Sequence, residues 1–227
     1  MLLGGVLALL VALCAAAGYV YFRNDIATQQ TARSSRVVVV AASPTADGST
    51  AANLIVEVLP GRSSDISPDT PVTIPDTSFT RLGDAYAFAG ASGVAEAVPS
   101  TAPAGPTGWV DLPAASWQGL LDRSGGVAIT LPTSVRVFDG AQLTTFPAGT
   151  RTLNGAEVAT LLVGSAYLPE DLRTAIRADI ERVLLRALTS ESGVETLIHT
   201  NLGADDLKGW LARLSQAPLE SSGTVVP

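Results

Sequence analysis

The chain has 227 residues and a formal net charge of −7, and 47% of its residues are hydrophobic. The hydrophobic share is enough for a core of ordinary size. The acidic balance argues against a nucleic-acid-binding protein, because a basic face supplies most of the affinity for phosphate backbones. One cysteine and one histidine exclude an intramolecular disulfide and a structural zinc site with four such ligands.

The most distinctive segment is the apolar N-terminus. Residues 2–22 carry no charge, and Arg23 ends the run. About 20 apolar residues at 1.5 Å each span the ~30 Å hydrocarbon core, so we predict a transmembrane anchor at 1–23. Cys14 lies within this run and is interpreted as a small hydrophobic side chain. Cleavage as a secretory signal is the alternative, although basic residues before the apolar run are missing.

Residues 24–36 are polar and are predicted to form a stalk. Arginines follow the span at 23, 33 and 36, while only the terminal amine precedes it. Taken alone, the positive-inside rule therefore favours a cytoplasmic domain.

Beyond the stalk, short strands alternate with helices. Apolar or β-branched runs bounded by Pro or Gly predict strands at 37–41, 53–59, 109–112 and 127–131, and a hairpin at 134–146. Helical spacing predicts helices at 83–97, 114–123, 156–163, 169–188, 192–198 and 204–214, the third of these with Asn154 as its N-cap. The polar residues 63–71 are predicted to be a loop. We expect an α/β fold, an α-β-α sandwich with a mixed central sheet over 37–216 and a flexible tail at 217–227.

Motifs that carry chemistry are scarce. No GxSxG, GxxxxGK[ST] or GxGxxG pattern occurs. The single histidine, His199, is more typical of a surface or helix-terminal side chain than of a catalytic triad. Asp65 and Asp69 follow a strand and could hold a metal ion, although their spacing favours a solvated turn. A solvated charged face is predicted on the longest helix, formed by Asp179, Glu181, Arg182 and Arg186.

Four segments occur in an order that resembles the LytR–CpsA–Psr family. They are 84–90 (DAYAFAG), 120–132 (LLDRSGGVAITLP), 146–155 (FPAGTRTLNG) and 199–207 (HTNLGADDL). The third is the most specific and is similar to the family's "LPAGKQTLNGEQAL". The resemblance runs over about 37–214. It implies a membrane-anchored, extracytoplasmic domain of a family that transfers glycopolymers from a polyprenyl pyrophosphate carrier to the cell wall.

The family's charged site is only partly matched. Family members bind pyrophosphate with arginines and a magnesium ion held by aspartates. The family's "GSD", "RSDT" and "VRSR" are replaced here by uncharged stretches at 42–44, 49–52 and 162–165. The resemblance leaves Asp69, Arg81 and Arg177 as candidate catalytic residues and Asp69 as the candidate magnesium ligand.

These losses predict a domain that keeps the family's fold and has lost most of its chemistry. Each lost contact to a developing phosphoryl charge can cost roughly 2.7–4 kcal/mol. We therefore expect a pseudoenzyme without a cofactor that binds a polyprenyl-phosphate lipid or an envelope protein. Val163 makes the site more apolar, so a pocket for a polyprenyl tail can persist.

Two alternatives stay open. One is an active phosphotransferase that uses Asp69, Arg81, Arg177 and magnesium to attach a glycopolymer to the cell wall. The other is a structural subunit of an envelope assembly. All three interpretations place a single-pass protein in the cell membrane. The resemblance implies an extracytoplasmic domain, against the charge rule.

Overall fold

The structure is a computed structural model that describes residues 36–45, 48–74, 77–78, 80–99, 107–216 and 220–221. Within these ranges, no helix combines the length and the apolar character needed to cross a bilayer. The anchor predicted at 1–23, the stalk up to residue 35 and most of the tail at 217–227 lie outside the described residues.

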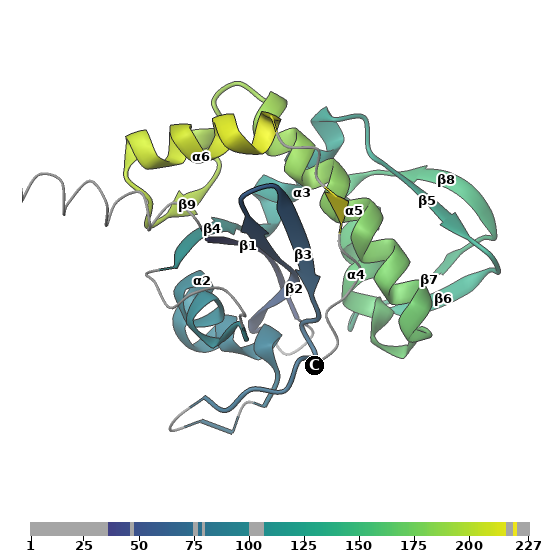
Figure 1. The fold of residues 1–227 in the computed structure, drawn as a ribbon. Coiled ribbons are helices and arrows are strands. Elements are labelled where there is room, and N and C mark those ends of the chain that lie inside the picture. The colour runs from purple at the N-terminus through teal and green to yellow at the C-terminus, as the bar shows by residue number, and fades with distance from the viewer. Residues whose placement is uncertain are drawn as a thin grey trace, which may run out of the picture.

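A mixed six-stranded sheet forms the centre of the domain (Figure 1). Its strands, in spatial order, are β10 (Glu220–Ser221), β3 (Arg62–Ile66), β2 (Thr50–Leu59), β1 (Val37–Pro44), β4 (Gly108–Leu112) and β9 (His199–Thr200). β1 pairs parallel with β4 and antiparallel with β2. Because β1 is covered on both faces, its sequence is a continuous β-branched run rather than an alternating one.

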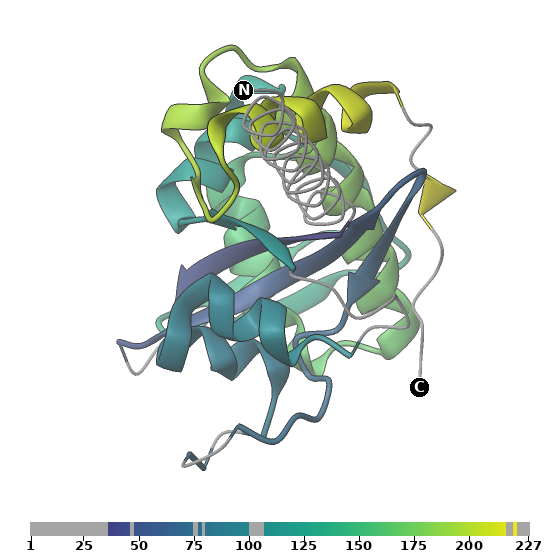
Figure 2. The ribbon, with the colours of Figure 1, turned by 60° about the vertical axis from the view of Figure 1, so that its left-hand side comes forward.

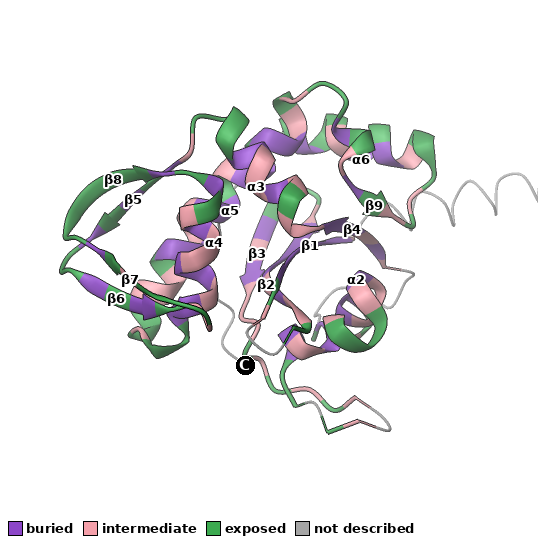
Figure 3. Ribbon diagram, turned by 180° about the vertical axis from the view of Figure 1, so that it is seen from behind, coloured by how far each residue is buried: buried purple, intermediate pink, exposed green. Residues whose placement is uncertain are grey.

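Helices cover both faces of this sheet, which confirms the predicted sandwich (Figure 2). One face carries the short helix η1 (Leu82–Asp84) and α2 (Ala85–Ala97). The other carries α3 (Ala114–Arg123), α4 (Gly155–Val163) and α5 (Glu170–Ser190), with α6 (Ala204–Gln216) packed against α5. Burial follows the layers, because the sheet strands are largely buried while the outer side of α2 is exposed (Figure 3).

Two small antiparallel sheets of two strands each extend the second layer beyond α5 (Figure 1). β5 (Val127–Leu131) pairs with β8 (Gly149–Leu153), and β6 (Val135–Phe138) pairs with β7 (Leu143–Phe146). The predicted cap of α4 is confirmed, since the Asn154 side chain accepts from the Glu157 N–H and the Glu157 carboxylate accepts from the Asn154 N–H. The cap holds α4 so close to α3 that a Cβ on Gly155 would lie 2.3 Å from the Gln118 carbonyl oxygen.

The loop predicted at 63–71 is wrong in its first part, because Arg62–Ile66 form β3. Polarity suggested a loop, but two polar side chains of β3, Ser63 and Asp65, are buried against α5. Ser63 Oγ donates to Glu181, and Asp65 accepts from Arg177. Glu181, which we expected on a solvated face, is therefore buried.

Three further segments differ from the expectation. Only Val194–Thr196 form a short helix, η3, within the helix predicted at 192–198. Another short helix, η2 (Gly164–Tyr167), follows α4 directly. In the tail, Glu220–Ser221 pair parallel with the outer edge of β3 as β10 (Figure 2).

Candidate functional site

A cavity of about 140 Å³ lies between the start of β2, the loop from β3 to η1, the end of α4 and the N-terminal half of α5. Asp69, Arg81 and Arg177, the three residues that the resemblance singled out, all line it. Asp69 and Arg81 come from the segment between β3 and η1 and Arg177 comes from α5, so their convergence is a property of the fold. Val163 and Ser165, in the stretch that replaces the family's "VRSR", also line the cavity and add no charge there.

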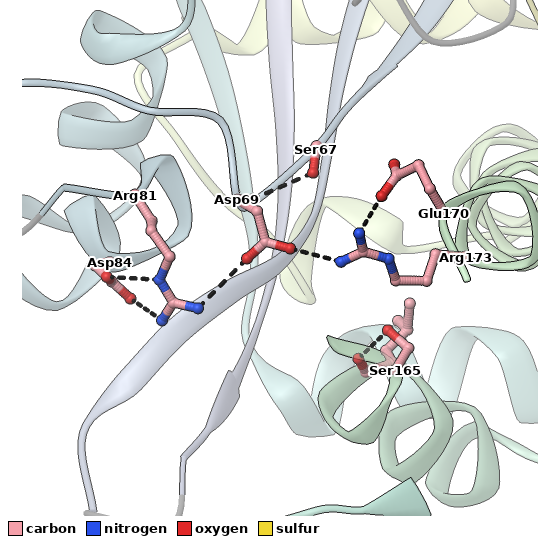
Figure 4. A network of polar contacts seen from close by, with 8 residues as sticks. Ser67, Asp69, Arg81, Asp84, Ser165, Glu170 and Arg173 are labelled. Atoms are coloured by element: carbon pink, nitrogen blue, oxygen red, sulfur yellow. Dashed lines mark hydrogen bonds and ion pairs between the residues drawn. The ribbon is translucent and has the colours of Figure 1, made fainter. Parts of the chain in front are cut away.

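A chain of ion pairs crosses one side of this cavity (Figure 4). The two carboxylate oxygens of Asp69 are divided between two guanidinium groups: Oδ1 lies 3.4 Å from Arg81 Nη1, and Oδ2 lies 2.8 Å from Arg173 Nη1. Arg81 also donates to both oxygens of Asp84, at 2.8 and 3.1 Å, and Arg173 donates to Glu170. The hydrogen bonds that Arg81 donates to Asp84 are the main cause of the raised pKa of Arg81.

Arg177 is held by a buried ion pair deeper in the site. Its Nε lies 2.7 Å from Asp65 Oδ2, and the two side chains are 4% and 6% exposed. Burial raises the pKa of Asp65, and the charge of Arg177 opposes that rise. Asp65 is thus paired with an arginine in the core. The solvated turn that its spacing favoured is wrong for this residue, and it does not stand beside Asp69 as the alternative of a shared metal site requires.

Three buried N–H groups of the lining make no hydrogen bond to the described residues, although one of them, Arg177 Nη2, lies 3.6 Å from Glu170 Oε1. Arg173 Nε, Arg177 Nη2 and Asn53 Nδ2 are buried, and none has a hydrogen-bond partner among the described residues. All three residues line the cavity. A buried donor without an acceptor costs about 1–3 kcal/mol. The cavity therefore suits a ligand rich in acceptor oxygens, and phosphate is such a group.

Arg173 and Asn53 were not among the site residues predicted from the sequence. Arg173 precedes Arg177 by four residues, a spacing that places both on one face of a helix, and this signal could have found it. No comparable pattern marks Asn53, whose role depends on where the N-terminal part of β2 meets the loop after β3.

A second cavity of about 360 Å³ adjoins the first, and Thr45 and Val163 line both. Its walls include Pro44, Ala159 and Val163, together with the turn of the β6–β7 hairpin. Ser43 Oγ lines it and is buried without a partner among the described residues. This cavity is larger and less charged than the arginine-lined one.

His199 lies away from both cavities, as expected for a surface histidine. Its exposed ring is 3.6 Å from the carboxylate of Asp111 on the neighbouring strand. Asp111 accepts from Tyr86 Oη at 3.0 and 3.1 Å, and burial beside this carboxylate raises the pKa of Tyr86 to about 12. Within the described part of the chain, no three His, Cys, Asp or Glu side chains are grouped so that they could hold a metal ion.

No family model matches the chain, and no curated protein matches it either. Solved structures do match it. The LytR-Csp2A-Psr enzyme from Actinomyces oris is 16% identical with a TM-score of 0.60, over 82% of this chain and 77% of that one. TagT from B. subtilis is 16% identical with a TM-score of 0.54, over 82% and 75%. A TagT structure bound to LIIa-WTA is 17% identical with a TM-score of 0.53, over the same shares. The described domain therefore has the LytR–CpsA–Psr fold that the order of its motifs predicted.

Proposed function

We propose that this domain binds a polyprenyl-linked phosphate or pyrophosphate lipid of the cell envelope and does not transfer a glycopolymer. One observation carries the proposal. Three arginines line a single cavity in a LytR–CpsA–Psr fold, while the carboxylates beside them, Asp69 and Asp84, are engaged by those arginines. The cavity thus has groups that bind an anion, and both of its carboxylates are paired with arginines.

The anionic head group fits the smaller cavity. Its volume of about 140 Å³ exceeds the roughly 10–15 Å³ that one water needs. Guanidinium groups bind phosphate oxygens through paired hydrogen bonds. Arg177 and Arg173 offer such N–H groups from the same helix, and Asn53 offers an amide from the sheet.

The adjoining cavity suits the start of an apolar tail. Pro44, Ala159 and Val163 provide carbon surface directly beside the arginine-lined site. A lipid with its phosphate in one cavity and its first isoprene units in the other would use both. An N-terminal membrane anchor would keep the domain within reach of such a lipid, and we place the domain on the extracytoplasmic side.

Catalysis would require more than binding. Phosphoryl transfer depends on cations that stabilise the developing charge, usually with magnesium held by oxygen ligands. Arg81 and Arg173 share Asp69, and Asp84 is bound by Arg81. The uncharged stretches at 42–44 and 162–165 supply none of the missing charges. One observation favours the alternative, an active transferase: the three candidate catalytic residues line the same cavity.

Calorimetric titration of the full chain in detergent micelles with farnesyl pyrophosphate tests the proposal. Separate titrations with farnesol and with inorganic pyrophosphate measure how much of the affinity comes from the tail and how much from the head group. We expect farnesyl pyrophosphate to bind and Arg173→Gln to weaken binding at least about tenfold, by loss of a charge-assisted contact. Arg182→Gln, on the exposed side of the same helix, is the matched control and keeps the wild-type affinity.

A second measurement tests turnover. The chain is incubated with a polyprenyl pyrophosphate-linked saccharide, magnesium and a cell-wall acceptor, and products are followed by mass spectrometry. Binding without product supports the proposal. Product formation that Asp69→Ala abolishes would establish the transferase instead. Failure of farnesyl pyrophosphate to bind would reject the lipid-binding function in favour of a structural subunit.

A further inference from the structure

Asp69 contacts the two outer arginines of the cavity, Arg81 and Arg173, as an anionic ligand would. Each of its carboxylate oxygens faces a different guanidinium group, one from Arg81 just before η1 and one from Arg173 on α5 (Figure 4). Two oxygens of a bound phosphate would take the same hydrogen bonds. Resting on the anion-binding function proposed above, we propose that Asp69 is a built-in competitor that an anionic ligand must displace.

The backbone around Asp69 is fixed, so the competition involves the side chain alone. The Gly83 N–H donates to the Pro68 carbonyl at 2.8 Å, and the Leu82 N–H donates to the Thr70 carbonyl at 2.9 Å. A Cβ on Gly83 would lie 2.7 Å from the Ala52 carbonyl oxygen, so the loop rests directly on β2. These contacts hold the carboxylate over the arginines without needing the carboxylate itself.

The side chain of Asp69 can leave without opening the fold. It is 41% exposed, and its partner Arg81 is 55% exposed. Ion pairs at such exposure are weak because water screens them and competes for both partners. A rotation of the side chain toward solvent would release Arg81 and one N–H of Arg173.

The inner donors of the cavity, Arg177 Nη2 and Arg173 Nε, can bind a ligand whether or not Asp69 contacts the outer arginines. Arg177 is oriented by Asp65, and its Nη2 is buried without a hydrogen-bond partner among the described residues. Arg173 Nε is in the same condition. A ligand that replaces Asp69 would therefore exchange one outer contact and gain inner contacts that the carboxylate does not make.

This role is the opposite of a magnesium ligand. Were Asp69 to hold magnesium, its loss would weaken metal-assisted anion binding. As a competitor, its loss strengthens anion binding, because one of the two carboxylates in the cavity wall is neutralised. The sign of the change separates the two roles.

The test is calorimetric titration of the full chain, in detergent micelles at low salt, with inorganic pyrophosphate in the presence of a chelator. We expect Asp69→Asn to bind pyrophosphate about fivefold more tightly than the wild type, the change that corresponds to an exposed ion pair of roughly 1 kcal/mol. Asp179→Asn is the matched control, since this aspartate forms an exposed pair with Arg182 on the same helix as Arg173. It leaves the affinity unchanged.

A double variant checks the cause of the gain. If the guanidinium group released on Arg173 produces the gain, Asp69→Asn tightens pyrophosphate binding less in the Arg173→Gln background, compared with Arg173→Gln alone, than it does in the wild type. Equal or weaker binding by Asp69→Asn, with wild-type binding intact, overturns the competitor role and leaves the proposed function standing. Absence of pyrophosphate binding in both proteins rejects the anion site itself.

Discussion

Replacing Arg177 by methionine removes the cation that contacts the buried carboxylate of Asp65. Arg177 Nε lies 2.7 Å from Asp65 Oδ2, and both side chains are almost completely buried. Removing one partner of such a pair leaves an uncompensated charge, which costs about 3–5 kcal/mol. Since a domain of this size is stable by only about 5–15 kcal/mol, we expect a large part of the total to be lost.

The loss depends on pH in a defined direction. Burial already raises the pKa of Asp65, and removing the positive charge of Arg177 raises it further. The folded variant then keeps the proton to higher pH than the unfolded chain does. Its free energy of unfolding therefore falls as pH rises above about 4, so the cost of Arg177→Met is larger at neutral pH than in acid.

The assay is denaturant unfolding of the full chain in detergent micelles, followed by tryptophan fluorescence. Trp117 is fully buried under the sheet and donates from Nε1 to the Ala42 carbonyl, so it reports on loss of the core. The exposed Arg182→Met is the control and shifts stability by less than about 0.5 kcal/mol. A double variant, Asp65→Leu with Arg177→Met, should recover most of the loss because no buried charge remains. If Arg177→Met costs less than about 1 kcal/mol, or if the double variant is as unstable as the sum of its parts, the reasoning about this pair is wrong.

Two further variants test the packing around the site. Burial raises the pKa of Glu181 above its ordinary 4.5, so the free energy of unfolding falls as pH rises through that range. Glu181→Gln keeps an acceptor for Ser63 and removes the charge, so thermal unfolding should show a gain in Tm that is larger at about pH 7 than at about pH 5. An equal gain at both pH values would refute the titration of this residue. Gly155→Ala should lower stability by about 1–3 kcal/mol or more, because its Cβ would meet the Gln118 carbonyl oxygen at 2.3 Å. Gly119→Ala, in a helix with room for the methyl group, is its control and should be neutral or stabilising.

Local patterns were enough for most elements. The β-branched run of β1, the capping box at Asn154 and the apolar spacing of α5 each carry their structure within a few residues. They were predicted because the physical cause is local: side-chain branching, a cap hydrogen bond or one apolar helix face. β3 was missed because its buried side chains are polar, and only α5 shows why a serine and an aspartate are buried there.

Part of the candidate site was predicted from the sequence and part was not. Asp69, Arg81 and Arg177 were found through the order of motifs along the chain, and all three line one cavity. Arg173 was not found, because its contact with Asp69 joins residues 104 positions apart. Asp65 was grouped with Asp69 for their closeness in sequence, while the structure turns one into the core and the other toward the cavity.

By itself, then, the sequence determined the alternation of strands and helices, the apolar N-terminal segment and the type of fold. Tertiary structure alone decided which charges far apart in the chain neutralise one another. Ion pairing is set by distance and burial in space, and residues far apart in the chain meet only when α5 packs against β3 and its following loop.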